Sequence, residues 1–494
     1  MASEFDRVGQ GRVIAEVARL VDTWRGFSLG TATEPYPIEA PLYQPAGAGE
    51  RAVSDTTMHL LQHWFRHEPH LLRGGRAFKY WPHQRRLVET FIYLYEVRGI
   101  RRTEELYKLA EVEPLGPQHD PWAKMGGQLA TGSGKTKMMS LIIAWAYLNA
   151  VLERESRLGF GQHAILIAPN LFVKDRLLQD FDPPKGETSV FFSDPVVPPA
   201  FERDFNLKVY RPDNCPLTLD PNDGALVVTN FHQLLRERED APTAFDREQR
   251  QMEILFHAGE PERLEAVSSP LIERFAHSRG LLVLNDEAHH VWDETGHAKF
   301  EQKASEKARL TKDEEMVKDM AWIRSIRKLN GNGRVALQVD LSATLFEEAG
   351  ATTKSGKVGK KAGTEFKPAD LFRHTSVYYS LADAIRDGIV KRPVLERVEV
   401  RNQKTGEIEP HIREGQPNAW EKYRNLLVTG IERWKKVKKQ LEDEGDSRKP
   451  ILFILSNDRN DAREVANFLR YGEATRDDLQ GRAVTGLENQ RGEP

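Results

Sequence analysis

The stretch QLATGSGKTKMM, residues 128–139, places two glycines, a lysine and a threonine between an apolar stub and an apolar run. Glycine permits positive φ and lets backbone N–H groups approach an anion. Such N–H groups at a helix N-terminus favour phosphate. In the pattern G-x-x-x-x-G-K-[ST] the lysine reaches the β- and γ-phosphates of ATP and the hydroxyl ligates Mg²⁺. The expected nucleotide-binding residues here are Thr131, Gly132, Ser133, Gly134, Lys135 and Thr136.

This loop departs from the general pattern at one position, because Leu129 stands where the first glycine is expected. The competing interpretation is an ordinary Gly/Ser turn with an incidental lysine. The context favours the phosphate loop, since a strand-like stub precedes it and an apolar helical run follows it.

A second candidate lies in LLVLNDEAHH, residues 281–290. Its apolar residues predict a buried strand, and Asp286 and Glu287 follow at the carboxyl end, where α/β sheets bind ligands. Asp286 suits Mg²⁺ held through water, and Glu287 suits orienting and deprotonating an attacking water. Lys135, Asp286 and Glu287 are therefore the expected catalytic residues, with Thr136 and Asp286 on the metal. The alternative is a solvated acidic turn.

The elements that must position these residues are short apolar runs, at 164–168, 225–229, 281–285 and 335–342. The runs are continuously apolar rather than alternating, which is typical of buried parallel strands. Helix-like segments lie between several of them, so the pattern predicts an α/β fold with an open parallel sheet.

Composition restricts the class of protein. The 494 residues suggest roughly two to four domains, and 39% hydrophobic with 29% charged residues suffices for real cores. The net charge of -3 does not indicate nucleic acid, so such binding needs local basic faces such as KSGKVGKK and RWKKVKK. A single cysteine, Cys215, excludes intrachain disulfides. Without a signal peptide or a long apolar stretch, we expect a cytoplasmic protein with no membrane partner.

The expected domains follow the changes in pattern along the chain. Residues 1–75 are an accessory N-terminal segment, and 76–348 form the first domain. Residues 349–368 are a mobile basic loop, and 369–494 are an incomplete second α/β domain with a strand at 450–456 and a helix at 461–470. A full second domain needs more strands, so we expect an N-terminal portion of a longer protein, or half of a split one.

The motifs LATGSGKT, DEAHH and LSATLF (341–346) resemble motifs I, II and III of superfamily-2 helicases of the DEAD/DEAH-box type. More narrowly, APNLFVKDRL (168–177), NDEAHH and AIRDGIVKRPVL (384–395) are similar to the restriction-subunit branch, which includes the R subunit of type III restriction enzymes and related phage-defence helicases. The resemblance covers roughly residues 80–470. It implies a RecA-like parallel sheet with flanking helices, a P-loop NTPase, and the start of a second RecA-like lobe.

The resemblance also implies roles for single residues. Gln84 matches the glutamine that reads the adenine edge, unless it is a surface residue of a helix. The residues that would couple the nucleotide site to nucleic acid are His289, Ser342 and Thr344. Those that would touch the phosphates of the tracking strand are Pro169, Asn170, Arg176, Thr229, Asn230 and Phe231, although these are equally well read as ordinary β–α turns.

Two departures from the superfamily pattern bear on activity. Leu345-Phe346 stands where many relatives carry proline, and we find no motif V and no motif VI, whose arginines normally reach the γ-phosphate. An arginine finger contributes ~10³–10⁵ in rate, so the chain alone is expected to be a poor ATPase.

The favoured function is an ATP-dependent motor on double-stranded or forked DNA, working with Mg²⁺ in a restriction or defence system beside methyltransferase, nuclease or other defence subunits. The first alternative is a nucleotide-gated DNA-binding subunit with little hydrolysis of its own. A weaker alternative is a P-loop kinase.

Overall fold

The structure of the protein is a computed structural model that describes part of the chain. The described residues are 10–24, 51–66, 69–72, 75–112, 120–153, 158–230, 233–234, 270–288, 325–331, 333–345, 372, 374–392, 408, 412–413, 415–416, 418–456 and 459–471. The chain divides into two compact units, Met1–Lys391 and Arg392–Pro494. Each unit is considered by itself.

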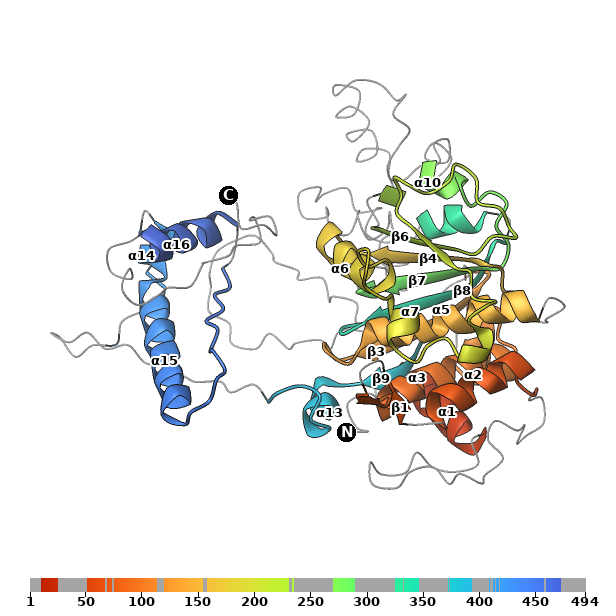
Figure 1. Cartoon of the computed structure of the whole chain (residues 1–494), viewed down its shortest axis with the longest axis horizontal. Helices are drawn as coiled ribbons and strands as arrows, with labels where there is room; N and C mark the ends of the chain where they lie inside the picture. Colours follow the sequence, from red (N-terminus) through yellow and green to blue (C-terminus); the bar gives the residue numbers. More distant parts are fainter. Residues whose placement is uncertain are drawn as a thin grey trace, which may run out of the picture. The chain divides into compact units, whose positions relative to one another are not determined.

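The first unit is built on a seven-stranded sheet with the order β5-β6-β4-β7-β8-β3-β9, in which all the strand pairs are parallel (Figure 1). Its strands are β3 (Ala123–Leu129), β4 (His163–Ala168), β5 (Lys208–Tyr210), β6 (Ala225–Asn230), β7 (Leu281–Asp286), β8 (Val335–Ser342) and β9 (Thr375–Tyr379). A separate antiparallel pair joins β1 (His70–Leu71) to β2 (Ala77–Phe78). The runs at 164–168, 225–229, 281–285 and 335–342 lie in β4, β6, β7 and β8, as predicted.

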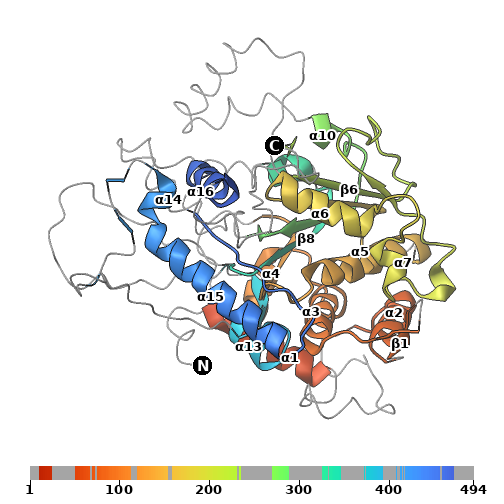
Figure 2. The same cartoon turned by 60° about the vertical axis from the view of Figure 1, so that its left-hand side comes forward.

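Helices cover both faces of this sheet. In the first unit they are α1 (Gln10–Trp24), α2 (Asp55–Phe65), α3 (Pro82–Ile92), a π-helix (Tyr93–Val97), α4 (Thr103–Leu109), α5 (Lys135–Leu152), α6 (Leu171–Phe181), α7 (Val190–Ser193), a 3₁₀ turn (Pro199–Phe201), α10 (Pro270–Glu273) and α13 (Leu381–Arg386). Figure 2 shows α6 and α7 close to α5, which is buried along most of its length. This arrangement is the RecA-like α/β fold that was expected.

Side chains along each strand alternate between the two faces of the sheet, so the hydrophobic core has two parts. Leu166 and Val339 pack with α1, α2, α3, α5 and α6 on one face. Ile165 and Val283 pack with Phe275 and with the helical residues 325–330 on the other. Because both faces are covered, the strands are mostly apolar, which explains the hydrophobic runs in β4, β6 and β7.

Two expected boundaries differ from the structure. The described parts of residues 1–75 are not a separate accessory segment, because α1 and α2 contribute Val17, Trp24 and Trp64 to the main core. Residues 375–391 were expected in the second domain, but β9 pairs with β3 in the first sheet and the first unit extends to Lys391. The basic loop at 349–368 lies outside the described residues.

The second unit contains α14 (Ala419–Lys422), α15 (Arg424–Asp443) and α16 (Arg459–Tyr471), which share a small apolar core. The predicted strand at 450–456 forms no strand ladder with any described residue. The segment returns along α15 (Figure 1), with the Trp434 indole donating to the Pro450 carbonyl at 2.8 Å. Ile451, Phe453 and Leu455 are more than four-fifths exposed. An apolar run predicts a strand only where a neighbouring strand pairs with it.

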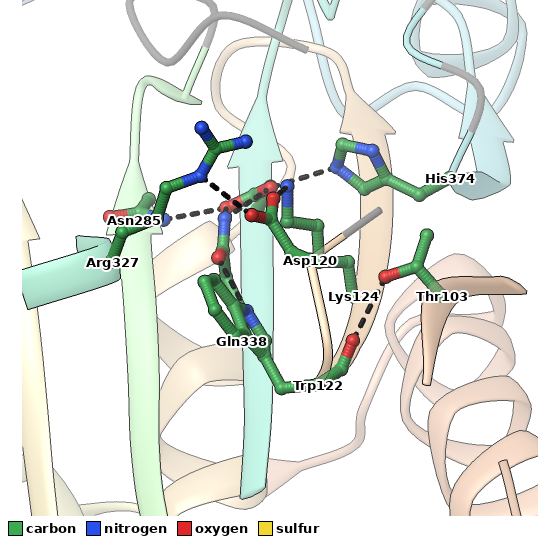
Figure 3. A network of polar contacts seen from close by, with 9 residues as sticks. Thr103, Asp120, Trp122, Lys124, Asn285, Arg327, Gln338 and His374 are labelled. Atoms are coloured by element: carbon green, nitrogen blue, oxygen red, sulfur yellow. Dashed lines mark hydrogen bonds and ion pairs between the residues drawn. The ribbon is translucent and has the colours of Figure 1, made fainter. Parts of the chain in front are cut away.

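A buried polar network crosses one face of the first sheet (Figure 3). The Asp340 carboxylate accepts hydrogen bonds from Asn285 Nδ2 at 2.6 Å, Gln338 Nε2 at 3.0 Å and His374 Nε2 at 2.8 Å. Burial by itself would raise the pKa of Asp340, but these donors outweigh it and hold the pKa below its usual value. Every second residue of β8 lies on the same face of the sheet, so Gln338, Asp340 and Ser342 share one face. The network therefore lies next to the carboxyl end of the strand.

We expect Asp340→Ala to lower the free energy of unfolding of the first unit by about 3–5 kcal/mol, because it removes a buried charge and leaves three buried donors without their acceptor. Chemical denaturation at neutral pH measures this. The matched control is Asp182→Ala, whose carboxylate is 44% exposed in a surface pair with Arg211 and should change stability by less than about 0.5 kcal/mol. Since the folded pKa of Asp340 is depressed, its contribution is complete above pH ~4 and declines as the pH falls. Equal losses in the two variants would contradict the assignment.

Candidate nucleotide-binding site

The loop between β3 and α5 has the backbone geometry of an anion-binding turn. Gly132 and Gly134 have φ of 83° and 87°, and Gly134 is the residue that precedes α5. A side chain at Gly134 would also displace the Gln84 amide, since an added Cβ would lie 2.4 Å from Gln84 Nε2. The positive φ therefore favours glycine here, and the turn leaves the first N–H groups of α5 available to a ligand.

Two side chains at the start of α3 hold this loop in place. The Gln84 amide donates to the Ser133 carbonyl at 2.9 Å and accepts from the Trp81 N–H at 3.0 Å. His83 Nε2 lies 2.8 Å from the same carbonyl, and its ring stacks on Tyr379 with centroids 4.1 Å apart. Because a carbonyl only accepts, His83 Nε2 must carry the proton. Burial lowers the pKa of His83, which keeps the ring neutral at pH 7.

Gln84 thus bridges α3 to the phosphate loop instead of lying on the surface, and it is only 3% exposed. Adenine reading by this amide stays a prediction. His83 was missed by sequence reasoning. Its position beside Gln84 at a helix start was the available signal.

The order of the strands in the sheet brings Asp286 and Glu287, here called the acidic pair, close to the phosphate loop at 131–136. Strand β8 lies between β7 and β3, with Asp286 in register with Leu341 and Gln128 in register with Ser342. The carboxyl ends of β3, β7 and β8 therefore meet at one edge. There Lys135 Nζ lies 2.6 Å from Glu287 Oε1, and the Ser342 hydroxyl donates to Glu287 Oε2 at 3.4 Å.

Glu287 adopts an unusual backbone conformation. Its φ of 50° lies in the left-handed region, and it is one of two described residues other than glycine with positive φ. Such a conformation costs on the order of 1–3 kcal/mol and is concentrated at functional sites. It turns the chain immediately after β7, where the Glu287 carboxylate faces Lys135 while Asp286 remains at the strand end.

Asp286 is fully buried, and burial raises its pKa. Its Oδ2 lies 3.5 Å from Arg176 Nη2, and the charges of Lys135 and Arg176 offset part of the burial effect. Thr136 is partly buried at the start of α5. Mg²⁺ uses one or two carboxylates with waters and phosphate oxygens, not an all-protein cage. A hydroxyl and a buried carboxylate fit that requirement, and no cluster of three or more ligating His, Cys, Asp or Glu side chains occurs among the described residues.

The expected nucleic-acid residues lie at neighbouring strand ends. Asn170 is exposed and caps α6 by accepting from the Val173 N–H at 2.9 Å. Asn230 is buried at the end of β6, in register with Ala168 of β4, and accepts from the Gln233 N–H at 3.3 Å. Pro169 is partly buried and Thr229 is fully buried. These contacts also suit ordinary β–α turns. Phe231 lies outside the described residues.

The coupling candidates are described in part. Ser342 is buried against Glu287, as given above, and its hydroxyl also accepts from the N–H of Thr344 at 3.1 Å. Thr344 itself is exposed. Ser342 therefore bridges the acidic pair and the turn that follows β8. His289 lies outside the described residues.

Comparison with known proteins places this geometry in a family. The model of the family described as type III restriction enzyme, res subunit, matches residues 82–347, more than half of the 494 residues. The chain belongs to the type III restriction enzyme res subunit family. The resemblance to the restriction-subunit branch is thereby confirmed over that range. No curated protein sequence matches the chain.

Membership of the res subunit family makes residues 82–347 a helicase-like P-loop NTPase domain. The matched range contains Gln84, the loop 131–136, Asp286, Glu287 and Ser342. A cleft of about 780 Å³ lies at the amino ends of β4 and β7, near His163 and Arg279. None of these site residues lines it. None of the described helices is both long and apolar enough to cross a membrane.

Proposed function

We propose that the protein is an ATP-dependent DNA helicase or translocase motor of a restriction or phage-defence system. The observation that carries the proposal is the 2.6 Å ion pair between Lys135 and Glu287, which joins the phosphate loop to the acidic pair. A lysine at a glycine-bracketed helix start and a carboxylate just after the buried strand β7 are groups that nucleoside triphosphate hydrolysis uses, the lysine on the phosphates and the carboxylate on the attacking water.

Each residue of the site then has a stated task. The N–H groups at the start of α5 and the Lys135 ammonium bind the phosphates, and the Thr136 hydroxyl and Asp286 would hold Mg²⁺. When bound, Mg²⁺ supplies charge neutralisation on the phosphates. The Glu287 carboxylate orients the attacking water and accepts its proton once Lys135 turns to the phosphates. The Ser342 hydroxyl keeps that carboxylate directed at the site.

The DNA-contacting edge is proposed at the carboxyl ends of β4 and β6. Asn170 and Arg176 are exposed there or beside it, and α6 begins at Asn170. Positioning contacts to phosphates need donors of this kind but no base readout. The proposed substrate is double-stranded or forked DNA, and the proposed partners are methyltransferase, nuclease or other defence subunits.

A second candidate function is a nucleotide-gated DNA-binding subunit that hydrolyses little. One observation favours it: the apolar segment 450–456 pairs with no strand among the described residues of the second unit, so those residues do not assemble a second sheet. In a motor, the arginine that accelerates hydrolysis would come from a second lobe that closes on the first.

Phosphate release with and without DNA distinguishes the two candidates. The motor proposal expects Mg²⁺-dependent release that rises at least about tenfold on adding duplex or forked DNA, since DNA binding completes the site. Single-stranded RNA of equal length is the control polymer. Nucleotide-dependent DNA binding without stimulated release would favour the gated subunit. An absence of both nucleotide and DNA binding would contradict both candidates.

A further inference from the structure

Arg176 pairs with the carboxylate that is expected to hold Mg²⁺. Its guanidinium Nη2 lies 3.5 Å from Asp286 Oδ2. The two residues come from different elements, since Arg176 lies on α6, the helix that begins with the expected DNA-contacting turn, and Asp286 ends β7. The pair is therefore a direct link from the proposed DNA edge to the nucleotide site.

Asp286 needs a cation because it is fully buried, and an uncompensated buried carboxylate is costly. Two basic side chains act on it electrostatically, Lys135 and Arg176. Lys135 is already paired at 2.6 Å with Glu287. Among the described residues, Arg176 consequently provides the direct cation contact to Asp286.

The other end of this pair is open to solvent, because the Arg176 side chain is 54% exposed. When the guanidinium leaves it is hydrated by solvent, so the cost of the exchange falls on the buried Asp286 carboxylate, which Mg²⁺ would then neutralise. Asp180 lies one turn further along α6 and also interacts electrostatically with Arg176. This interaction is still present when Asp286 binds another cation. An arginine fork is well suited to a phosphate diester as its next partner.

We propose that Arg176 is a coupling residue that alternates between two anions. Without nucleotide it neutralises Asp286, and when Mg²⁺ occupies that carboxylate the guanidinium is released to bind a phosphate of the DNA backbone. Nucleotide and DNA then strengthen each other's binding, and by linkage they do so by the same factor. This inference rests on the proposed function for its DNA half only. Its first half concerns Mg²⁺ and nucleotide alone.

The test compares Arg176→Ala with Arg211→Ala in the full chain. Arg211 has a similarly exposed side chain and pairs at 3.6 Å with Asp182, a carboxylate that is 44% exposed and is not one of the site residues. The first measurement titrates a fluorescent non-hydrolysable ATP analogue without DNA. With Mg²⁺, Arg176→Ala should bind it about 2- to 5-fold tighter than wild type, because the competitor for Asp286 is gone. With EDTA in place of Mg²⁺ this gain should disappear. Arg211→Ala should match wild type in both.

The second measurement is the affinity for a fluorescent duplex oligonucleotide with and without the Mg²⁺-bound analogue. Wild type and Arg211→Ala should bind DNA more tightly with nucleotide, and in Arg176→Ala this ratio should fall towards one. An equal loss of DNA affinity in both states, with unchanged nucleotide binding, would make Arg176 a simple phosphate contact and overturn the inference. Weaker Mg²⁺-nucleotide binding by Arg176→Ala would also overturn it. If wild type binds no DNA, the motor proposal fails and the nucleotide titration alone decides the competition for Asp286.

Discussion

Glu287→Gln is expected to reduce ATP turnover by about 10²–10⁴-fold while nucleotide binding is kept, since a general base contributes rate factors of this size. Glutamine has nearly the same shape and can still accept from the Ser342 hydroxyl, which lies 3.4 Å from the carboxylate. It cannot take a proton from water, and it no longer competes for Lys135, whose ammonium lies 2.6 Å away. Phosphate release and binding of an ATP analogue, measured on the same preparation, separate the two effects.

The matched control for this variant is Glu187→Gln, at an exposed position outside the residues assigned to the site. It should leave both turnover and binding within about twofold, as surface substitutions away from functional groups generally do. Turnover equal in wild type and Glu287→Gln would remove Glu287 from the chemistry. Loss of nucleotide binding in Glu287→Gln would instead make it a positioning residue.

Lys135→Ala is expected to weaken Mg²⁺-ATP binding by about 10²–10³-fold, because truncating one partner of a close charge pair costs ~2–5 kcal/mol. Two effects combine. The phosphates lose their cation, and the Glu287 carboxylate is left as an unneutralised negative charge beside them. Since the second effect needs that charge, Lys135→Ala combined with Glu287→Gln should bind nucleotide more tightly than Lys135→Ala alone. Titration of the fluorescent analogue measures all of these affinities.

Lys137 provides a control two residues further along the same helix. It pairs with Asp194 and lies over the Phe78 ring, 5.1 Å from its centroid. Lys137→Ala removes the same charge from the same turn of α5 without touching the acidic pair, so nucleotide affinity should change by less than about threefold. Equal losses in the two lysine variants would mean that only net charge near the loop matters.

Much of the first sheet was predictable because its strands are buried on both faces. Four strands therefore appear as continuous apolar runs, and the phosphate loop marks a fifth, β3. The edge strand β5, Lys208–Tyr210, has three residues and no apolar pattern, so no such signal exists. Strand β9 was assigned to a second domain, since a linear pattern does not reveal that the chain returns to pair with β3.

The candidate site was predictable in its residues but not in its pairings. Glycines, Lys135 and the acidic pair are recognisable by type and spacing. Lys135 contacts Glu287, and Arg176 contacts Asp286. These pairings depend on the strand order and on where α6 begins, and no local sequence pattern shows either. The network around Asp340 had one signal, the polar alternation of Gln338, Asp340 and Ser342 within an otherwise apolar strand. Its partner His374 lies too far along the chain for any local pattern to connect them.

A structure of the protein with Mg²⁺ and a non-hydrolysable ATP analogue tests the central claim most directly. The account predicts that the triphosphate lies in the turn around Ser133 with the Lys135 ammonium on it, that Thr136 and Asp286 face the metal, and that the pairs Lys135–Glu287 and Arg176–Asp286 are both broken. A triphosphate bound elsewhere, or bound with Lys135 still paired to Glu287, would contradict it.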